Sequence, residues 1–90
     1  MVEKTIKQLK GLTGIEFVYE SKTDYYLGSF NYWVIRLEII NNMYYFKAKH
    51  PQLTLNSWGN ELSAAWEIMG TKLDMFSEGA IKPFSKLFSD

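Results

Sequence analysis

The stretch that decides the fold runs from Phe30 to His50 and reads FNYWVIRLEIINNMYYFKAKH. The run from Phe30 to Ile40 is rich in β-branched and aromatic residues, whose side chains would alternate between the two faces of a strand. This pattern is typical of a half-buried strand. Asn41 and Asn42 follow this run, and asparagine tolerates the positive φ angles that a two-residue type I′ turn requires. The sequence therefore predicts a β-hairpin that turns at these two asparagines.

The turn fixes the register of the hairpin, and the residue pattern tests that register. Across one face it pairs Ile39 with Tyr44, Leu37 with Phe46 and Ile35 with Ala48. Across the other face it pairs Glu38 with Tyr45, Arg36 with Lys47 and Val34 with Lys49. A slip of one residue would mix the apolar and charged sets, so one face of the hairpin is predicted to be core.

Upstream of the hairpin, the pattern predicts a helix and a strand. Val2, Ile6 and Leu9 share one helical stripe, which indicates a helix over 2–10 that ends at Gly11 and Gly14. Ile15 to Glu20 alternates with period two and is predicted to be a strand. Ser21 to Ser29 contains Ser, Thr, Asp and Gly and is predicted to be a loop.

Downstream of the hairpin, the pattern predicts two helices. Pro51 ends the preceding strand, and Leu53 to Leu55 is either a short edge strand or a loop. Ser57 is predicted to cap a helix from about Trp58 to Phe76, with Gly79 as its C-terminal stop. A last short helix is expected over Ala80 to Phe88.

These elements predict one α+β domain over residues 1–90. Its expected architecture is a three-stranded antiparallel meander, with an N-terminal helix and two C-terminal helices packed on one face. This order is similar to that of double-stranded-RNA-binding domains, as is the Ala64-Ala65 pair on the helix after the third strand. Such domains carry a lysine cluster at the start of that helix, whereas the corresponding segment here, Asn56 to Glu61, contains no basic residue.

The composition restricts the classes of function. Ten basic and ten acidic residues give a net charge of zero, which argues against a strong basic field for nucleic-acid binding. The chain has no cysteine, and 17% of its residues are aromatic. Nine lysines stand against one arginine, a usage typical of AT-rich genomes such as those of low-GC bacteria and their phages. Neither a signal peptide nor a membrane helix is predicted, so we expect a cytoplasmic protein.

Residues with catalytic potential are few. His50 is the only histidine, no second imidazole or thiolate can join it at a metal, and no G-x-S-x-G elbow occurs. Glu16 and Glu20 on one extended strand would lie about 13 Å apart, too far to act on one substrate atom. Gly11 to Gly14 matches only the bare G-x-x-G of KH loops. We predict no catalytic, cofactor or metal site; a small enzyme that uses His50 is the third alternative.

The aromatic residues give the main functional hypothesis. The predicted core takes up Phe17, Trp33, Tyr44, Phe46, Trp66 and Phe76, which leaves over Tyr25, Tyr26, Tyr32, Tyr45 and Trp58. An apolar and aromatic sheet face opposite the helices would be unusual on a monomer and typical of an interface. The predicted interface residues are Val18, Tyr32, Val34, Arg36, Ile40, Met43, Tyr45 and Lys47.

The first functional hypothesis is accordingly a small non-enzymatic protein-binding module. We expect an inhibitor or accessory factor of a phage or low-GC bacterium, whose partner is another protein or a second copy in a homodimer. In a competing interpretation, the C-terminal segment Ile81 to Phe88 covers the same face. A second functional alternative is a nucleic-acid-binding module that uses Tyr32, Arg36, Tyr45, Lys47 and Lys49.

Overall fold

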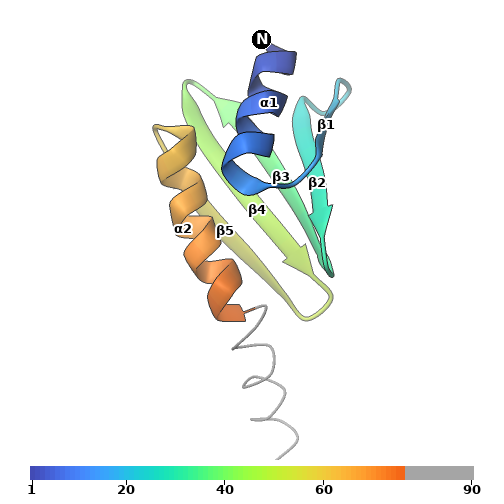
Figure 1. The fold of residues 1–90 in the computed structure, drawn as a ribbon, viewed down its shortest axis with the longest axis vertical. Coiled ribbons are helices and arrows are strands. Elements are labelled where there is room, and N and C mark those ends of the chain that lie inside the picture. Colours follow the sequence, from blue (N-terminus) through green and yellow to red (C-terminus); the bar gives the residue numbers. More distant parts are fainter. Residues whose placement is uncertain (77–90) are drawn as a thin grey trace, which may run out of the picture.

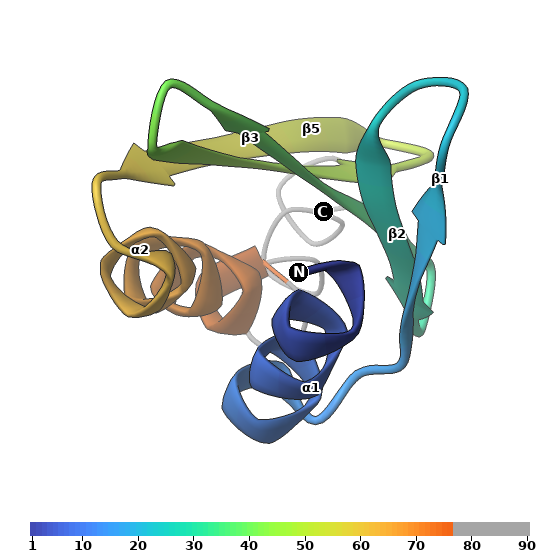
Figure 2. The same cartoon turned by 90° about the horizontal axis from the view of Figure 1, so that it is seen from above.

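The computed structural model describes residues 1–76, which form a five-stranded antiparallel sheet and two helices. The elements follow the chain as α1 Val2–Thr13, β1 Phe17–Glu20, β2 Tyr25–Phe30, β3 Trp33–Ile40, β4 Met43–His50, β5 Leu53–Gly59 and α2 Leu62–Asp74. The strands lie in sequence order across the sheet. Both helices lie on the same side of the sheet, which curves around them (Figures 1 and 2).

The central hairpin of β3 and β4 confirms the predicted register. Leu37 pairs with Phe46 and Ile40 pairs with Met43. Asn41 and Asn42 have φ angles of 50° and 64°, as a type I′ turn requires.

The predicted three-stranded meander is wrong, because the sheet has five strands. The run from Phe30 to Ile40 is not one strand: Asn31 and Tyr32 form a second two-residue turn, across which Phe30 pairs with Trp33. Asn31 adopts a φ of 56°, and a single asparagine therefore suffices to reverse the chain inside an aromatic run. With five strands between its helices, the chain does not follow the order of double-stranded-RNA-binding domains.

The predicted loop over Ser21 to Ser29 is also wrong beyond Asp24, because Tyr25 begins strand β2.

Gly28 explains how this strand approaches β1 so closely. A Cβ atom at Gly28 would lie 3.1 Å from the carbonyl oxygen of Glu16 and 3.2 Å from the ring of Phe17. The absence of a side chain at position 28 thus lets β2 pack closely against β1 and the residues that precede it.

The region after β4 corrects two further expectations. Leu53 to Gly59 is a full strand, and α2 begins at Leu62 instead of near Trp58. Ser57 does not cap the helix: it is buried in β5, and its hydroxyl donates a hydrogen bond of 2.8 Å to the Ala65 carbonyl oxygen. The expected stop at Gly79 and the second C-terminal helix over Ala80 to Phe88 lie outside the described residues.

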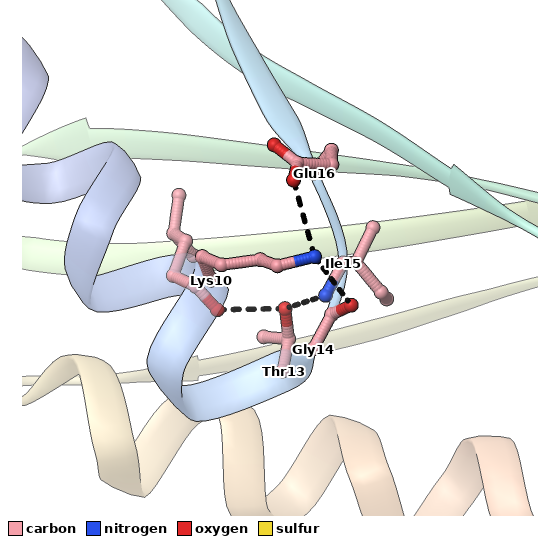
Figure 3. Close-up of polar contacts among 6 residues, drawn as sticks. Lys10, Thr13, Gly14, Ile15 and Glu16 are labelled. Carbon is pink, nitrogen blue, oxygen red and sulfur yellow. Dashed lines mark hydrogen bonds and ion pairs between the residues drawn. The ribbon is translucent and has the colours of Figure 1, made fainter.

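Helix α1 runs through Gly11 and ends three residues later than predicted, with Gly14 as its left-handed C-cap. The Thr13 hydroxyl donates to the Leu9 carbonyl at 2.7 Å and accepts from the Ile15 amide at 2.9 Å (Figure 3). The ammonium of Lys10 lies 3.1 Å from the carboxylate of Glu16, the residue before β1. These contacts fix the angle at which the chain leaves the helix and enters the sheet.

The core lies between the sheet and the helices. It contains Leu9 of α1, Met69 and Leu73 of α2, and the inward residues of the strands. Of the aromatic residues predicted for the core, Phe17, Trp33 and Phe46 are buried, and Tyr44, Trp66 and Phe76 pack against them half-buried. Trp66 of α2 meets the Phe46 ring edge-on at 5.3 Å. The helices therefore cover one face of the sheet and leave the other uncovered by residues 1–76.

Candidate functional site

The face of the sheet that points away from both helices is the candidate site, and we call it the outer face. Strand residues alternate between the core and this face, so the burial pattern and the strand register together define its members. They are Val18, Glu20, Tyr25, Leu27, Ser29, Val34, Arg36, Glu38, Ile40, Met43, Tyr45, Lys47, Lys49, Thr54, Asn56 and Trp58.

Seven of the eight predicted interface residues lie on the outer face. They are Val18, Val34, Arg36, Ile40, Met43, Tyr45 and Lys47. Tyr32 does not: it occupies the turn between β2 and β3, where its ring meets the ring of His50 edge-on at 6.2 Å. The structure thus separates Tyr32 from Tyr45, although the sequence pattern predicts that they share a face.

Other residues of the outer face were not predicted. Tyr25, Leu27 and Trp58 join it because β2 and β5 are full strands, whereas the sequence pattern predicts a loop at β2 and at most a short edge strand over Leu53 to Leu55. Tyr26, expected to be available for binding, is instead buried in the core against Tyr19. Once the segment is known to be a strand, the alternation of side chains along it predicts that Tyr25 and Leu27 lie on one face and Tyr26 on the other.

Large apolar side chains are strongly exposed on this face. The exposed fractions are 64% for Val18, 53% for Val34, 45% for Ile40, 39% for Tyr45 and 63% for Trp58. Because side chains of adjacent strands are neighbours on one face, these residues and the half-buried Leu27 and Met43 form one apolar and aromatic surface that charged residues interrupt.

Four of the five charged residues of the outer face lie in two neighbouring rows across the strands, and the fifth, Lys49, lies beside Val34 in a third row. One row, the Arg36 row, contains Val18, Leu27, Arg36, Lys47 and Asn56. The next, the Glu38 row, contains Glu20, Tyr25, Glu38, Tyr45 and Trp58. The cations of the first row therefore lie beside the anions of the second, and within residues 1–76 Glu38 and Lys47 form no ion pair.

Arg36 is positioned by an aromatic neighbour. Its guanidinium lies 4.3 Å from the centre of the Tyr25 ring, within the range of a cation–π contact. Stacking uses the flat side of the guanidinium, so the N–H groups at its edge remain able to bind a carboxylate in bidentate geometry. Arg36 is thus held in place without its hydrogen-bonding capacity being used by the ring.

A shallow depression of about 220 Å³ marks the centre of the outer face. Its lining includes Arg36, Glu38, Tyr45, Lys47 and Trp58, which come from three adjacent strands. Apolar walls beside two cations and one anion suit a partner surface that presents apolar groups and charges of both signs.

The free edge of the sheet at β5 is partly blocked. The Lys72 ammonium of α2 donates a hydrogen bond of 2.7 Å to the Asn56 carbonyl oxygen. A charged side chain or a helix that covers an edge strand opposes the addition of a further strand. The outer face, and not this edge, is therefore the more accessible surface.

The residues considered for catalysis are engaged in local structure. The Nδ1 atom of His50 accepts a hydrogen bond of 3.1 Å from the Gln52 amide, and the imidazole packs 4.9 Å from the Trp33 ring. Glu16 pairs with Lys10, and Glu20 accepts a hydrogen bond from the Lys22 amide. No group of three or more His, Cys, Asp or Glu residues that could hold a metal ion is found within residues 1–76.

A tyrosine at the β1 edge of the sheet has a perturbed pKa. The Tyr19 hydroxyl donates a hydrogen bond to the carboxylate of Asp24, in the turn between β1 and β2. This hydrogen bond, with smaller contributions from desolvation and from the negative charge of Asp24, raises the pKa of Tyr19 above its ordinary value. The contact stabilises the turn and involves no residue of the outer face.

Two further cavities lie on the helical side. One of about 400 Å³ is lined by Gln8 and Leu12 of α1 and by Glu61, Leu62 and Ser63 at the start of α2, among others. Another of about 270 Å³ is lined by both apolar and polar residues, including Ile15, Trp66 and Asp74. The lining of neither cavity contains a histidine or a pair of carboxylates.

Among residues 1–76, neither helix is long and apolar enough to cross a membrane. Comparison with protein-family models gives no match, and comparisons with curated proteins and with solved structures give none either. The geometry of the outer face is therefore the feature that points to a function.

Proposed function

We propose that this chain is a non-enzymatic protein-binding module and that the outer face is its binding surface. The observation that carries the proposal is the set of five strongly exposed large apolar side chains on one sheet face, none of which a described helix covers. Large apolar surfaces of this kind are rare on monomers and mark interaction sites. Tyrosine, tryptophan, methionine and arginine, all present on this face, are also the residues that interface cores favour.

An inhibitor or accessory factor is the class that fits this proposal best. Such a protein acts by occupying a partner's surface, which requires a complementary face and no catalytic group. An origin in a phage or a low-GC bacterium fits the lysine-rich, arginine-poor composition.

The test uses two isoleucines that are equally exposed. Ile40 on the outer face and Ile68 on α2 are each 45% exposed, so a lysine at either position adds the same charge at the same solvent accessibility. With the tagged full-length chain as bait, Ile40→Lys is expected to lose proteins that the wild type and Ile68→Lys both retain. Equal retention by both variants, or equal loss, contradicts the proposal.

Nucleic-acid binding is the second candidate, and one observation favours it: Arg36, Lys47 and Lys49 lie on the same face as Tyr45 and Trp58. Against it, the Glu38 row places two carboxylates beside these cations. A labelled single-stranded oligouridylate separates the candidates, because phosphate contacts weaken steeply between about 50 and 200 mM salt. We expect no binding of this probe at either salt concentration.

A further inference from the structure

The order of residues along β3 has a property that points to a particular partner. On the outer face this strand presents Val34, Arg36, Glu38 and Ile40 in sequence. A twofold rotation centred at Leu37 exchanges the two apolar ends, and it also exchanges the cation with the anion. A surface with this pattern is complementary to itself.

We propose that the partner of the outer face is a second copy of this chain, related by a twofold axis that crosses β3 at Leu37 perpendicular to the strand. The inference rests on the proposed function and names its partner. In this arrangement Arg36 of each copy faces Glu38 of the other, and Val34 faces Ile40.

The neighbouring strands support the same axis. Strand pairing places Leu37 in one row across the sheet with Tyr26 of β2, Phe46 of β4 and Ser57 of β5, and the proposed axis runs along this row. Rotation about this axis places Lys47 of one copy opposite the ring of Tyr45 of the other. This pair adds a cation–π contact to the two ion pairs on β3.

The alternative twofold axis, parallel to the strands, is disfavoured by charge. It would place Glu38 against Glu38 and Arg36 against Arg36 of the two copies. Juxtaposed like charges in an interface are strongly unfavourable. The charge pattern thus favours the axis perpendicular to β3 over the axis parallel to it.

The shape of the sheet limits the strength of the dimer. The outer face is convex, because the sheet curves around the helices (Figure 2). Contact between two copies is therefore centred on β3 and β4, which carry the paired residues. We expect a reversible dimer whose association is measurable at tens to hundreds of micromolar chain.

Charge reversal tests the axis with the full-length chain. Arg36→Glu alone places its new carboxylate against Glu38 of the second copy, and Glu38→Arg alone places two guanidinium groups together. Each single variant should lose at least about tenfold in self-association, because like charges then meet twice. An equimolar mixture should form a 1:1 heterodimer. The Arg36→Glu copy then carries two anions and the Glu38→Arg copy carries two cations, so opposite charges meet at both contacts.

Sedimentation equilibrium measures the self-association of the wild type, of each single variant and of the equimolar mixture. Circular dichroism confirms that each variant is folded. Lys7→Glu, an exposed charge reversal on α1, is the control and should dimerise like the wild type. If Arg36→Glu or Glu38→Arg does not fold, Arg36→Asp with Glu38→Lys gives a second pair for the same experiment.

Two results overturn the inference. A wild type that stays monomeric up to about 200 µM excludes the second copy as the partner. A wild-type dimer that both single variants leave intact, or that mixing does not restore, excludes this axis. In either case the proposed function stands if Ile40→Lys loses captured proteins that Ile68→Lys keeps, and it falls if both variants behave alike.

Discussion

The two faces of the sheet are built from the same strands and both carry aromatic residues, but they have different surroundings. Phe46 and Tyr45 are adjacent on β4; Phe46 is buried against Trp66 of α2, whereas Tyr45 is exposed on the outer face. Two helices cover the inner face, whereas no part of residues 1–76 covers the outer face. Aromatic residues therefore stabilise the fold on one side, and on the other they are available for binding.

The largest expected effect tests this contrast with two adjacent truncations. Phe46→Ala should lower the free energy of unfolding by about 3–5 kcal/mol, because it leaves a cavity among tightly packed core residues. Tyr45→Ala should lower it by less than about 1 kcal/mol, as surface substitutions generally do. Urea unfolding of both variants measures the difference, and equal losses would mean that the two faces are equally buried.

The second prediction asks whether the outer face is open in the whole chain. Tyr45→Lys combined with Val34→Glu should leave the free energy of unfolding within about 1 kcal/mol of the wild type, since both side chains remain in water. If the segment Ile81 to Phe88 covers this face, the same double variant buries two charges and loses about 3 kcal/mol or more. Thermal unfolding of the full-length chain distinguishes these outcomes.

The third prediction contrasts two glycines, one on the inner side of the sheet and one in solvent. Gly28→Ala should lower stability by about 1–3 kcal/mol, because its methyl group would press on the backbone of Glu16. Gly11→Ala should instead raise stability by about 1 kcal/mol, since α1 is exposed there and nothing lies within 4 Å. Destabilisation of similar size at both positions would contradict the close approach of β1 and β2.

The smallest effect concerns the edge of the sheet at alkaline pH. The pKa of Tyr19 is raised in the folded chain, so this group's contribution to stability is complete below its unfolded pKa of about 10. The contribution is lost as the pH rises from that value through the folded pKa. Over this range the wild type should lose more stability than Tyr19→Phe in matched urea titrations; parallel curves would argue against the hydrogen bond to Asp24.

The core could be largely predicted from the sequence, and the candidate site only in part. Alternation places Ile35, Leu37 and Phe46 on one face whatever the neighbouring strands are. Tyr26 and Trp58 are different, because an amphipathic aromatic residue fits either face. Their positions depend on β2, for which the local pattern predicts a loop, and on β5. For the β5 region the pattern predicts a short edge strand or a loop, followed by the start of a helix.

The wrongly predicted segments share a physical cause. At Asn31 a turn needs only one residue that tolerates positive φ, and the aromatic residues around it have high strand propensity on both sides of the turn. At Ser57 the same hydroxyl that could cap a helix donates to the Ala65 carbonyl across a tertiary contact. Local propensity is the same for both conformations, so long-range packing decides between them.

The sequence by itself determined the hairpin of β3 and β4, its register and its inner face. These follow from a side-chain period of two and from a turn of two asparagines, which are local properties. Only the tertiary structure decided that the sheet has five strands and that Trp58 and Tyr25 join Tyr45 on the outer face. The physical reason is that the face to which a side chain belongs is set by strand pairing and helix packing, which residues distant in the chain supply.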